Sequence, residues 1–308
     1  MIEINKLTKL IAVGAVVLTL TGCGNSSSST SDSVLDSIAE SGEMKVGISE
    51  NKLGFALENT KTGDLEGLEV DLVNQIAKDI AKKKGCDPIK VTFTKVNAKT
   101  RTSMLDTGEL DLSAASVTIT EERAKSWNFT SAYFNDPISV MAKKGAFPEG
   151  VDSFKTGGKK VEVAVVMGTT SKDALIKYME EEKGMSDWAD YVEFKEYTTN
   201  DDIIVALDSG ATDAYCVDYT QLFAYKGTSF EIFADTVGQS FEPQPLGLIT
   251  RYKTGGEDAE WTKFLQAEVR KFWEDGSITK WLEKQGYASQ DAPSDLDEEF
   301  GPYHHYKG

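Results

Sequence analysis

A short pattern that occurs twice in the chain constrains its fold more than any other feature. Residues 105–111 and 207–213 both have the form Leu-Asp-x-Gly-x-x-Asp. In each copy a helical pattern ends near the glycine, where a left-handed helix cap forms easily, and a short apolar strand pattern follows. The same helix-to-strand unit in both halves indicates a duplicated α/β architecture.

The segments around each copy alternate between strand and helix patterns, which is typical of parallel α/β sheets. We therefore expect two lobes, each a mostly parallel sheet flanked by helices. In the first half, expected strands at 44–48, 89–93 and 110–115 alternate with helices at 72–84 and 101–105. In the second half, expected strands at 161–166, 191–197 and 214–217 alternate with helices at 172–182 and 202–207.

Apolar segments at 138–143 and 246–250 flank the second lobe, and we expect them to cross between the lobes as a two-strand hinge. Helical patterns at 261–274 and 277–285 then return to the first lobe. The boundaries that follow are 39–140 with 247–287 for lobe 1, and 141–246 for lobe 2. The acidic, proline-containing segment 288–308 is expected to be a disordered tail.

The N-terminus predicts a lipoprotein signal peptide over residues 1–22. Lys6 and Lys9 precede an apolar run at 10–20 that is too short to span a bilayer. Residues 20–23, Leu-Thr-Gly-Cys, resemble the bacterial lipobox, which implies cleavage before Cys23 and lipidation of its thiol. The alternative is an ordinary signal peptide with a chance cysteine. The Ser-rich segment 23–38 is expected to be a flexible tether that anchors an extracytoplasmic protein to the membrane.

Composition excludes several classes of function. The net charge of −17 argues against nucleic acid, because phosphate binding needs clustered Lys and Arg. The only histidines, His304 and His305, are near the C-terminus, so a His-dependent catalytic site or a His-rich zinc site in the body is excluded unless the tail folds back. Cys23, Cys86 and Cys216 lack metal-ligand spacing. We expect no metal, no cofactor and no disulfide between Cys86 and Cys216.

The stretch 112–123 is the first candidate for a binding site. It reads as a buried strand followed by a helix start, where Thr120 can act as the cap and Glu121 and Glu122 suit the first turn. Arg123 opposes the helix dipole there, at a cost of roughly 0.3–1 kcal/mol. A guanidinium beside strand-end hydroxyls suits a small carboxylate, because Arg offers a planar pair of donors. The alternative is that Arg123 pairs with a neighbouring Glu on a solvated helix.

The repeat supplies a partner for this site. Ser116 and Asp218 each lie five residues after the final Asp of their copy. Both should therefore lie at the C-terminal ends of equivalent strands, the edge at which ligands bind in open α/β sheets. Ser116, Thr118 and Arg123 would then face Asp218 across a cleft, so that a carboxylate site opposes an ammonium site, as a free amino acid requires. The alternative for Asp218 is an ordinary strand-end or helix-cap residue.

Several motifs resemble those of the family 3 extracellular solute-binding proteins, the polar amino-acid receptors of ABC importers. The resemblance covers about residues 40–287 and implies a two-lobed, type II periplasmic-binding-protein fold. It also implies a monomeric binding protein without enzymatic activity, whose partners are a permease and an ATPase. The motifs are Gly-Leu-Glu-Val-Asp-Leu at 67–72, Thr-Ile-Thr-Glu-Glu-Arg at 118–123, Gly-Thr-Thr-Ser at 168–171 and Asp-Ala-Tyr-Cys-Val-Asp at 213–218.

This resemblance implies that Arg123 grips the α-carboxylate of the ligand and that Asp218 binds its α-ammonium. The supporting groups would be the Ser116 carbonyl, the Thr118 hydroxyl and backbone N–H groups around Thr169 and Thr170. Asn-Ala-Lys-Thr-Arg at 97–101 and Ser-Phe-Glu-Pro-Gln-Pro at 240–245 are similar to the aspartate/glutamate-binding subgroup. There the residue matching Arg101 meets the side-chain carboxylate, so the implied ligand is a polar, acidic L-amino acid.

The chain departs from that subgroup near the end of the first strand. Ser49 stands where an acidic-ligand relative carries Lys, and Lys52 stands where many members place an aromatic residue that covers the ligand. Lys52 is either a second positive charge for the ligand or a solvated loop lysine. Arg101 is either a ligand contact or a structural residue at a helix start.

Other functions remain open on the sequence alone. Cyclohexadienyl dehydratases share the implied architecture and need a catalytic carboxylate in the cleft, for which Glu50 is the candidate. A surface adhesin or sensor that keeps the fold for a protein partner is a third class.

Overall fold

The computed structural model describes residues 33–49, 52–225, 227, 229–252, 258–299 and 301–302. All described residues belong to one compact unit, Asp32–Gly308. The expected signal peptide, the Cys23 anchor, Glu50 and both histidines lie outside the described residues. Among the helices that are described, none combines the length and the apolar character needed to cross a bilayer.

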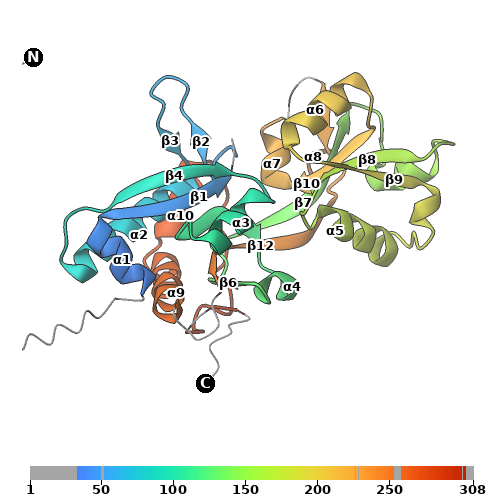
Figure 1. Cartoon of the computed structure of the whole chain (residues 1–308). Coiled ribbons are helices and arrows are strands. Elements are labelled where there is room, and N and C mark those ends of the chain that lie inside the picture. The colour runs from blue at the N-terminus through green and yellow to red at the C-terminus, as the bar shows by residue number, and fades with distance from the viewer. Residues whose placement is uncertain are drawn as a thin grey trace, which may run out of the picture. The chain divides into compact units, whose positions relative to one another are not determined.

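One continuous sheet runs through the unit, in the order β4-β1-β5-β12-β7-β10-β8-β9 (Figure 1). At one end of this order the strands are parallel: β1 (Glu43–Ser49), β4 (Lys90–Val96) and β5 (Leu112–Thr118). At the other end β8 (Val161–Val166), β9 (Val192–Tyr197) and β10 (Ala214–Asp218) are also parallel. These groups are the sheets of lobe 1 and lobe 2, and the expected α/β fold class is confirmed.

Two long antiparallel strands join the lobes. They are β7 (Phe134–Lys143) and β12 (Ser240–Arg251), which pair with each other in the middle of the sheet order. The crossing segments expected at 138–143 and 246–250 fall within them. Their action as a hinge stays a prediction.

Helices cover each lobe where the sequence patterns place them. Helix α2 (Leu68–Lys84) buries its apolar face, including Val73, Ile76 and Ile80, and ends at Gly85 in the left-handed conformation. In lobe 1 it is joined by α1 (Val34–Ser41), α3 (Thr100–Thr107), α4 (Glu121–Ala124), α9 (Ala259–Glu274) and α10 (Ser277–Lys284). In lobe 2 the helices are α5 (Ser171–Lys177), extended by a π-helical turn (Tyr178–Glu182), α6 (Asn200–Ser209), α7 (Tyr219–Phe223) and α8 (Phe233–Thr236).

The remaining described elements are short. They are the strands β2 (Leu57–Glu58), β3 (Leu65–Glu66), β6 (Trp127–Phe129) and β11 (Phe230–Ile232), and 3-10 helices at Gly150–Lys155 and Trp188–Asp190. Each lobe has its own apolar core, with Trp261 and Phe272 in lobe 1 and Phe154 and Phe233 in lobe 2.

The structure explains the repeat in physical terms. The Asp111 carboxylate accepts the Lys45 N–H at 2.7 Å, and the Asp111 N–H donates to the Lys45 carbonyl at 2.9 Å. Asp213 makes the same pair of bonds with Glu162, at 3.0 and 2.8 Å. Each aspartate thus links the N-terminal end of one parallel strand to its neighbour, β5 to β1 and β10 to β8. We call each such pair of bonds an aspartate clamp.

Two boundaries predicted from the sequence are wrong. The expected tether at 23–38 overlaps α1, which begins at Val34 and buries Leu35 and Ile38 in the core of lobe 1. Apolar side chains at helical spacing outweigh the Ser-rich composition there.

The C-terminal segment described over 288–299 and 301–302 packs on lobe 1, so the expected disorder is wrong for these residues. The side-chain amide of Gln290 exchanges hydrogen bonds of 2.8 Å with the backbone N–H and carbonyl of Asn135. Arg270 Nε donates to the Leu296 carbonyl at 2.6 Å, and the Leu296 side chain packs against the core. Acidic composition did not predict this, because the segment is held by an amide, backbone carbonyls and a leucine.

Candidate ligand-binding site

A cavity of about 120 Å³ opens at the C-terminal edge of β1, β5, β8 and β10. Each ligand contact predicted from the sequence lies on its wall: Ser49, Lys52, Arg101, Ser116, Thr118, Arg123, Thr169, Thr170 and Asp218. Further wall residues were not predicted, namely Thr198, Thr199, Asn200, Asp201, Gln221 and Tyr225. The residues predicted from the repeat and from the motifs therefore lie together around one cavity, while the ligand contacts themselves stay predictions.

Arg123 spans the two lobes with its guanidinium. Nη1 donates to the Thr118 carbonyl at 2.9 Å, and Nη2 donates to the Gly168 carbonyl at 3.1 Å. The Thr120 hydroxyl accepts the Arg123 N–H at 3.2 Å, so Thr120 caps α4 as expected. Glu122 pairs with Lys125 on the same turn. The structure thus favours the carboxylate site over a solvated pair with a neighbouring Glu.

Arg101 lies in the first turn of α3, but its side chain is only 9% exposed and lines the cavity. Nη1 donates to the Ala115 carbonyl at 3.0 Å, and Nε is buried without a hydrogen-bond partner among the described residues. Burial, followed by repulsion from Arg123, lowers the pKa of Arg101 to about 10. The guanidinium therefore remains charged at neutral pH and needs an acceptor.

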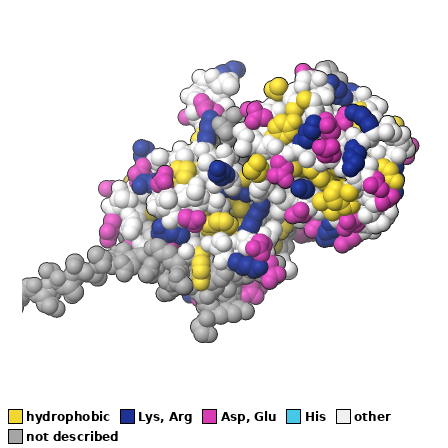
Figure 2. All heavy atoms as spheres, turned by 45° about the vertical axis from the view of Figure 1, so that its right-hand side comes forward, with side chains coloured by type: hydrophobic (Ala, Val, Ile, Leu, Met, Phe, Trp, Pro, Cys, Tyr) yellow, Lys and Arg dark blue, Asp and Glu magenta, His cyan; other side chains and the backbone are white. Residues whose placement is uncertain are grey.

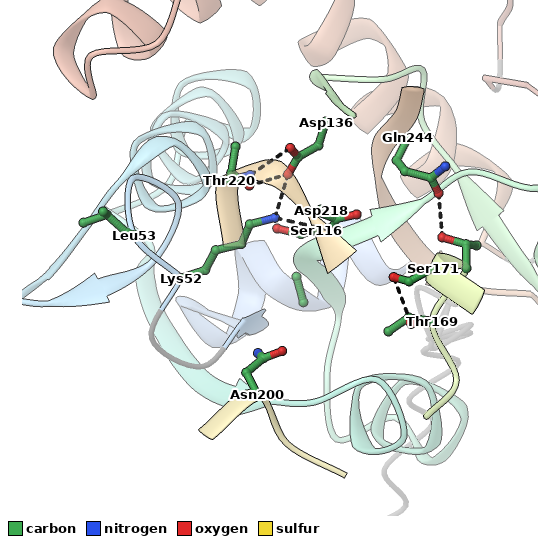
Figure 3. Close-up of polar contacts among 12 residues, drawn as sticks. Lys52, Leu53, Ser116, Asp136, Thr169, Ser171, Asn200, Asp218, Thr220 and Gln244 are labelled. Carbon is green, nitrogen blue, oxygen red and sulfur yellow. Dashed lines mark hydrogen bonds and ion pairs between the residues drawn. The ribbon is translucent and has the colours of Figure 1, made fainter. Parts of the chain in front are cut away.

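Lys52 is buried, so the prediction of a solvated loop lysine is wrong. Its side chain is 1% exposed, and Nζ lies 3.2 Å from Asp136 Oδ2 and 3.8 Å from Asp218 Oδ2 (Figure 3). Nζ also lies 4.4 Å from the centre of the Phe55 ring. Burial opposes the charge, but the attraction of Asp136, Asp218 and Glu69 outweighs it and raises the pKa of Lys52. Buried carboxylates thus draw this side chain inward.

Asp136 was not predicted as a site residue. It lies on β7 and is fully buried, and its carboxylate accepts the Thr220 N–H at 3.2 Å together with the Thr220 hydroxyl. The available signal was an ionisable residue shortly before the apolar crossing segment at 138–143, since a buried charge requires a partner. Asp136 therefore fixes Lys52 at the wall of the cavity.

Asp218 ends β10, and its carboxylate faces the cavity close to Lys52 (Figure 3). It precedes α7, yet its side chain makes no capping hydrogen bond, so the helix-cap alternative is wrong. Burial and then the charge of Asp136 raise the pKa of Asp218 to about 6, although Lys52, Arg101 and Arg123 lower it. The charge of this carboxylate is therefore not fully compensated, and Asp218 can bind a further cation.

Ser116 has a backbone φ of 48°, which is unusual for a residue other than glycine. Glu69 stabilises this turn, because its Oε1 accepts the Ser116 N–H at 2.7 Å, the Ser116 hydroxyl at 2.8 Å and the Tyr133 hydroxyl at 2.6 Å. Gly67 allows the start of α2 to approach, since a Cβ at that position would lie 2.2 Å from the Phe55 carbonyl oxygen. The motif at 67–72 therefore supports the cavity wall through Glu69, which holds Ser116 in place without lining the cavity itself.

The lobe 2 wall is organised around the start of α5. The Thr170 hydroxyl donates to Gln244 Oε1 at 2.6 Å, and Gln244 Nε2 donates to the Glu242 carbonyl at 2.8 Å. Thr169 donates to the Val166 carbonyl at 2.8 Å. These bonds tie the 168–171 motif to the 240–245 motif, and Thr169 and Thr170, which directly precede α5, line the cavity.

The excluded kinds of site find no support on the face seen in Figure 2 or among the described metal-ligating side chains. Acidic and basic side chains are mixed over the face seen in Figure 2, without a broad basic patch for phosphates. Within the described ranges no cluster of His, Cys, Asp and Glu has the arrangement to hold a metal ion. The cysteines that are described, Cys86 and Cys216, are free thiols.

Comparison with known proteins decides the family. Residues 44–286 match the bacterial extracellular solute-binding proteins, family 3. The chain belongs to this family. It is 30% identical over 287 residues to the ABC transporter glutamine-binding protein GlnH of Bacillus subtilis, which covers 89% of this chain and 96% of that protein. It is 27% identical over 288 residues to the glutamate-binding protein GluB of Corynebacterium efficiens, covering 91% of each.

Solved structures agree on the fold. An ancestral arginine-binding protein bound to glutamine matches with a TM-score of 0.62 and 26% identity, over 79% of this chain and 97% of that one. The cysteine-binding protein of Campylobacter jejuni matches with a TM-score of 0.65 and 21% identity, over 85% and 97%. This family member therefore has the type II periplasmic fold of extracytoplasmic, amino-acid-binding components of ABC transporters.

Proposed function

We propose that this solute-binding protein captures an acidic L-amino acid, glutamate or aspartate, and delivers it to the permease and ATPase of an importer. It acts as a monomer anchored to the cell membrane by a lipid on Cys23. The observation that carries the ligand class is a second guanidinium on the cavity wall, that of Arg101, whose buried Nε has no hydrogen-bond partner among the described residues.

Three charged groups on the wall match the charges of an acidic amino acid. Arg123 and Arg101 can each bind a carboxylate, and Asp218 can bind an ammonium. Glutamate and aspartate bring two carboxylates and one ammonium, so the charges of ligand and wall balance. A neutral amino acid leaves the Arg101 guanidinium without a carboxylate and its buried Nε without an acceptor, which is costly in a desolvated site.

The assigned roles follow this balance. Arg123 holds the α-carboxylate, with the Thr118 hydroxyl and the first turn of α5 behind Thr169 and Thr170. Asp218 holds the α-ammonium beside the Ser116 carbonyl. Arg101 holds the side-chain carboxylate, and Ser49 lines that end of the cavity.

Titration calorimetry of the purified chain against the twenty amino acids tests the ligand class. We expect glutamate and aspartate to bind about tenfold or more tightly than glutamine and asparagine. If glutamine bound most tightly, the proposed acidic specificity would be refuted, and the protein would still be an amino-acid receptor. Failure of all four to bind would refute the proposal.

Neither alternative function is favoured by the described cavity. Its carboxylates within the described part are Asp218, which lies among cations, and Asp201, which accepts the Tyr225 hydroxyl at 3.1 Å. Neither is placed as an isolated general acid or base. Turnover of prephenate would establish a dehydratase, and binding of a surface protein in the absence of amino-acid affinity would establish an adhesin or sensor.

The lipid anchor has a separate test. Metabolic labelling with palmitate should label the wild-type chain and fail to label Cys23→Ala, which should appear in the medium or the soluble fraction. Equal membrane retention of both forms would contradict the anchor.

A further inference from the structure

Lys52 places an ammonium group next to Asp218 before any ligand arrives. Its Nζ lies 3.8 Å from Asp218 Oδ2, while the closer contact of 3.2 Å to Asp136 keeps it in position (Figure 3). In a site without such a lysine, a ligand that lacks an α-ammonium leaves the aspartate buried and unpaired, which is strongly unfavourable. Here that cost is reduced, because Asp218 already has a cationic neighbour.

We infer that the cavity also binds small dicarboxylates that lack the α-ammonium, such as glutarate, with Lys52 as the resident partner of Asp218. The inference rests on the proposed function, because Arg123 and Arg101 must hold two carboxylates in both classes of ligand. It extends the substrate class from acidic amino acids to simple dicarboxylic acids.

Lys52 is held firmly enough for this role. The Phe55 ring lies under its ammonium, and the Thr220 N–H and hydroxyl hold the Asp136 carboxylate from the other side. The backbone next to Lys52 is held as well, because the Tyr287 hydroxyl donates to the Leu53 carbonyl at 3.1 Å. The ammonium is therefore preorganised, and it cannot move into solvent without leaving Asp136 unpaired.

The two guanidinium groups favour a dianion. Arg101 and Arg123 are close enough for Arg123 to contribute to the lowered pKa of Arg101, so each carboxylate that enters relieves their repulsion. Arg101 Nε is buried and lacks a partner among the described residues, and thus has a hydrogen bond to offer. A dicarboxylate satisfies both groups as an acidic amino acid does.

The two ligand classes should differ in proton uptake. The charged groups around Asp218 are Lys52 from the loop after β1, Asp136 from β7, Arg101 from α3 and Arg123 from α4. A dicarboxylate adds one more negative charge to this set than glutamate does, so its binding favours protonation of Asp218. Glutamate requires Asp218 to be ionised. Glutarate affinity should therefore rise as the pH falls from about 7.5 to about 5.5, whereas glutamate affinity should fall.

Calorimetry with L-glutamate and glutarate tests the inference on the full-length chain, Lys52→Met and the control Lys95→Met. Lys95 is an exposed lysine outside the cavity, paired with Glu58, and its loss removes the same charge. We expect wild type to bind glutarate within about 30-fold of glutamate. Lys52→Met should raise the ratio of the glutarate to the glutamate dissociation constant at least about tenfold, and Lys95→Met should leave it unchanged.

Lys52→Met leaves Asp136 buried without its cation and could therefore destabilise the fold. A second variant controls for this effect. Lys52→Met combined with Asp136→Asn removes the pair together and should show the same rise in the ratio. Glutamate binding without glutarate binding, or an unchanged ratio in both Lys52 variants, overturns the inference and leaves the proposed function intact. If neither ligand binds wild type, the proposed function fails and the inference falls with it.

Discussion

The two lobes share their scaffold at one edge of the sheet and differ at the other. At the N-terminal edge, Asp111 and Asp213 form equivalent clamps to Lys45 and Glu162. At the C-terminal edge, the equivalent positions carry Ser116, in a left-handed turn, and Asp218, a carboxylate among cations. The duplicated aspartates thus link neighbouring strands in both lobes, whereas the positions that diverge after each strand line the cavity.

The divergence also separates the charges. Lobe 1 contributes Lys52, Arg101 and Arg123, and lobe 2 contributes Asp218 and the start of α5. Contacts already cross between them, from Arg123 to the Gly168 carbonyl and from Lys52 to Asp218. A zwitterionic ligand with an extra carboxylate therefore has its partners on opposite walls, so ligand binding should stabilise a closed arrangement of the lobes.

The largest expected effect comes from removing either opposed charge. Asp218→Ala and Arg123→Ala should each weaken glutamate binding by about 100-fold or more, because each leaves a ligand charge buried and unpaired. Calorimetry measures this loss. The exposed residues Asp208 and Lys125, changed to alanine, are matched controls and should bind as wild type does. Retention of wild-type affinity in either cavity variant would refute the opposed-charge assignment for that lobe.

Arg101→Met should separate acidic from neutral ligands. Without this guanidinium the side-chain carboxylate of glutamate has no cation, so its affinity should fall by about 30-fold, while glutamine should lose less than about threefold. Lys99→Met, an exposed change just before the same helix, is the control. Equal losses for both ligands would show that Arg101 acts on the shape of lobe 1 and does not read the ligand side chain.

The affinity for amino acids should depend on pH through the protonation of Asp218 in lobe 2. The pKa of Asp218 is raised to about 6 in the ligand-free protein, and only the ionised form binds an ammonium. Affinity for glutamate should be constant well above this pKa and fall by about tenfold per pH unit below it. Calorimetry from about pH 5 to about pH 8 measures the slope. A flat profile would show that Asp218 stays ionised or does not contact the ammonium.

Much of the fold was predictable because it depends on local patterns. The repeat, the helix α2 with its closing Gly85 and the strand at Val161–Val166 all follow from residues near in sequence. Two residues of the cavity wall, Ser116 and Asp218, were predictable for the same reason, since each lies at a fixed distance in sequence from a clamp.

The position of Lys52 was not predictable from its neighbours. Its burial depends on Asp136, which is far away in sequence, and on Thr220 from lobe 2. Glu69 likewise accepts hydrogen bonds from the distant residues Ser116 and Tyr133. Gln290 holds the C-terminal segment by hydrogen bonds to the backbone of Asn135. Long-range polar pairs of this kind leave no periodic signal in the sequence.

The smallest expected effect concerns the clamps, and it tests whether the lobes are equivalent at their shared edge. Asp111→Ala and Asp213→Ala each remove an acceptor from a backbone N–H, at 2.7 and 3.0 Å, and should lower the free energy of unfolding by about 1–2 kcal/mol. Chemical denaturation measures both, with exposed Asp64→Ala as the control. Because the clamps lie at the edge away from the cavity, glutamate affinity should change by less than about twofold in either variant. A loss of stability in one lobe and none in the other would show that the shared pattern stabilises only one of the two sheets.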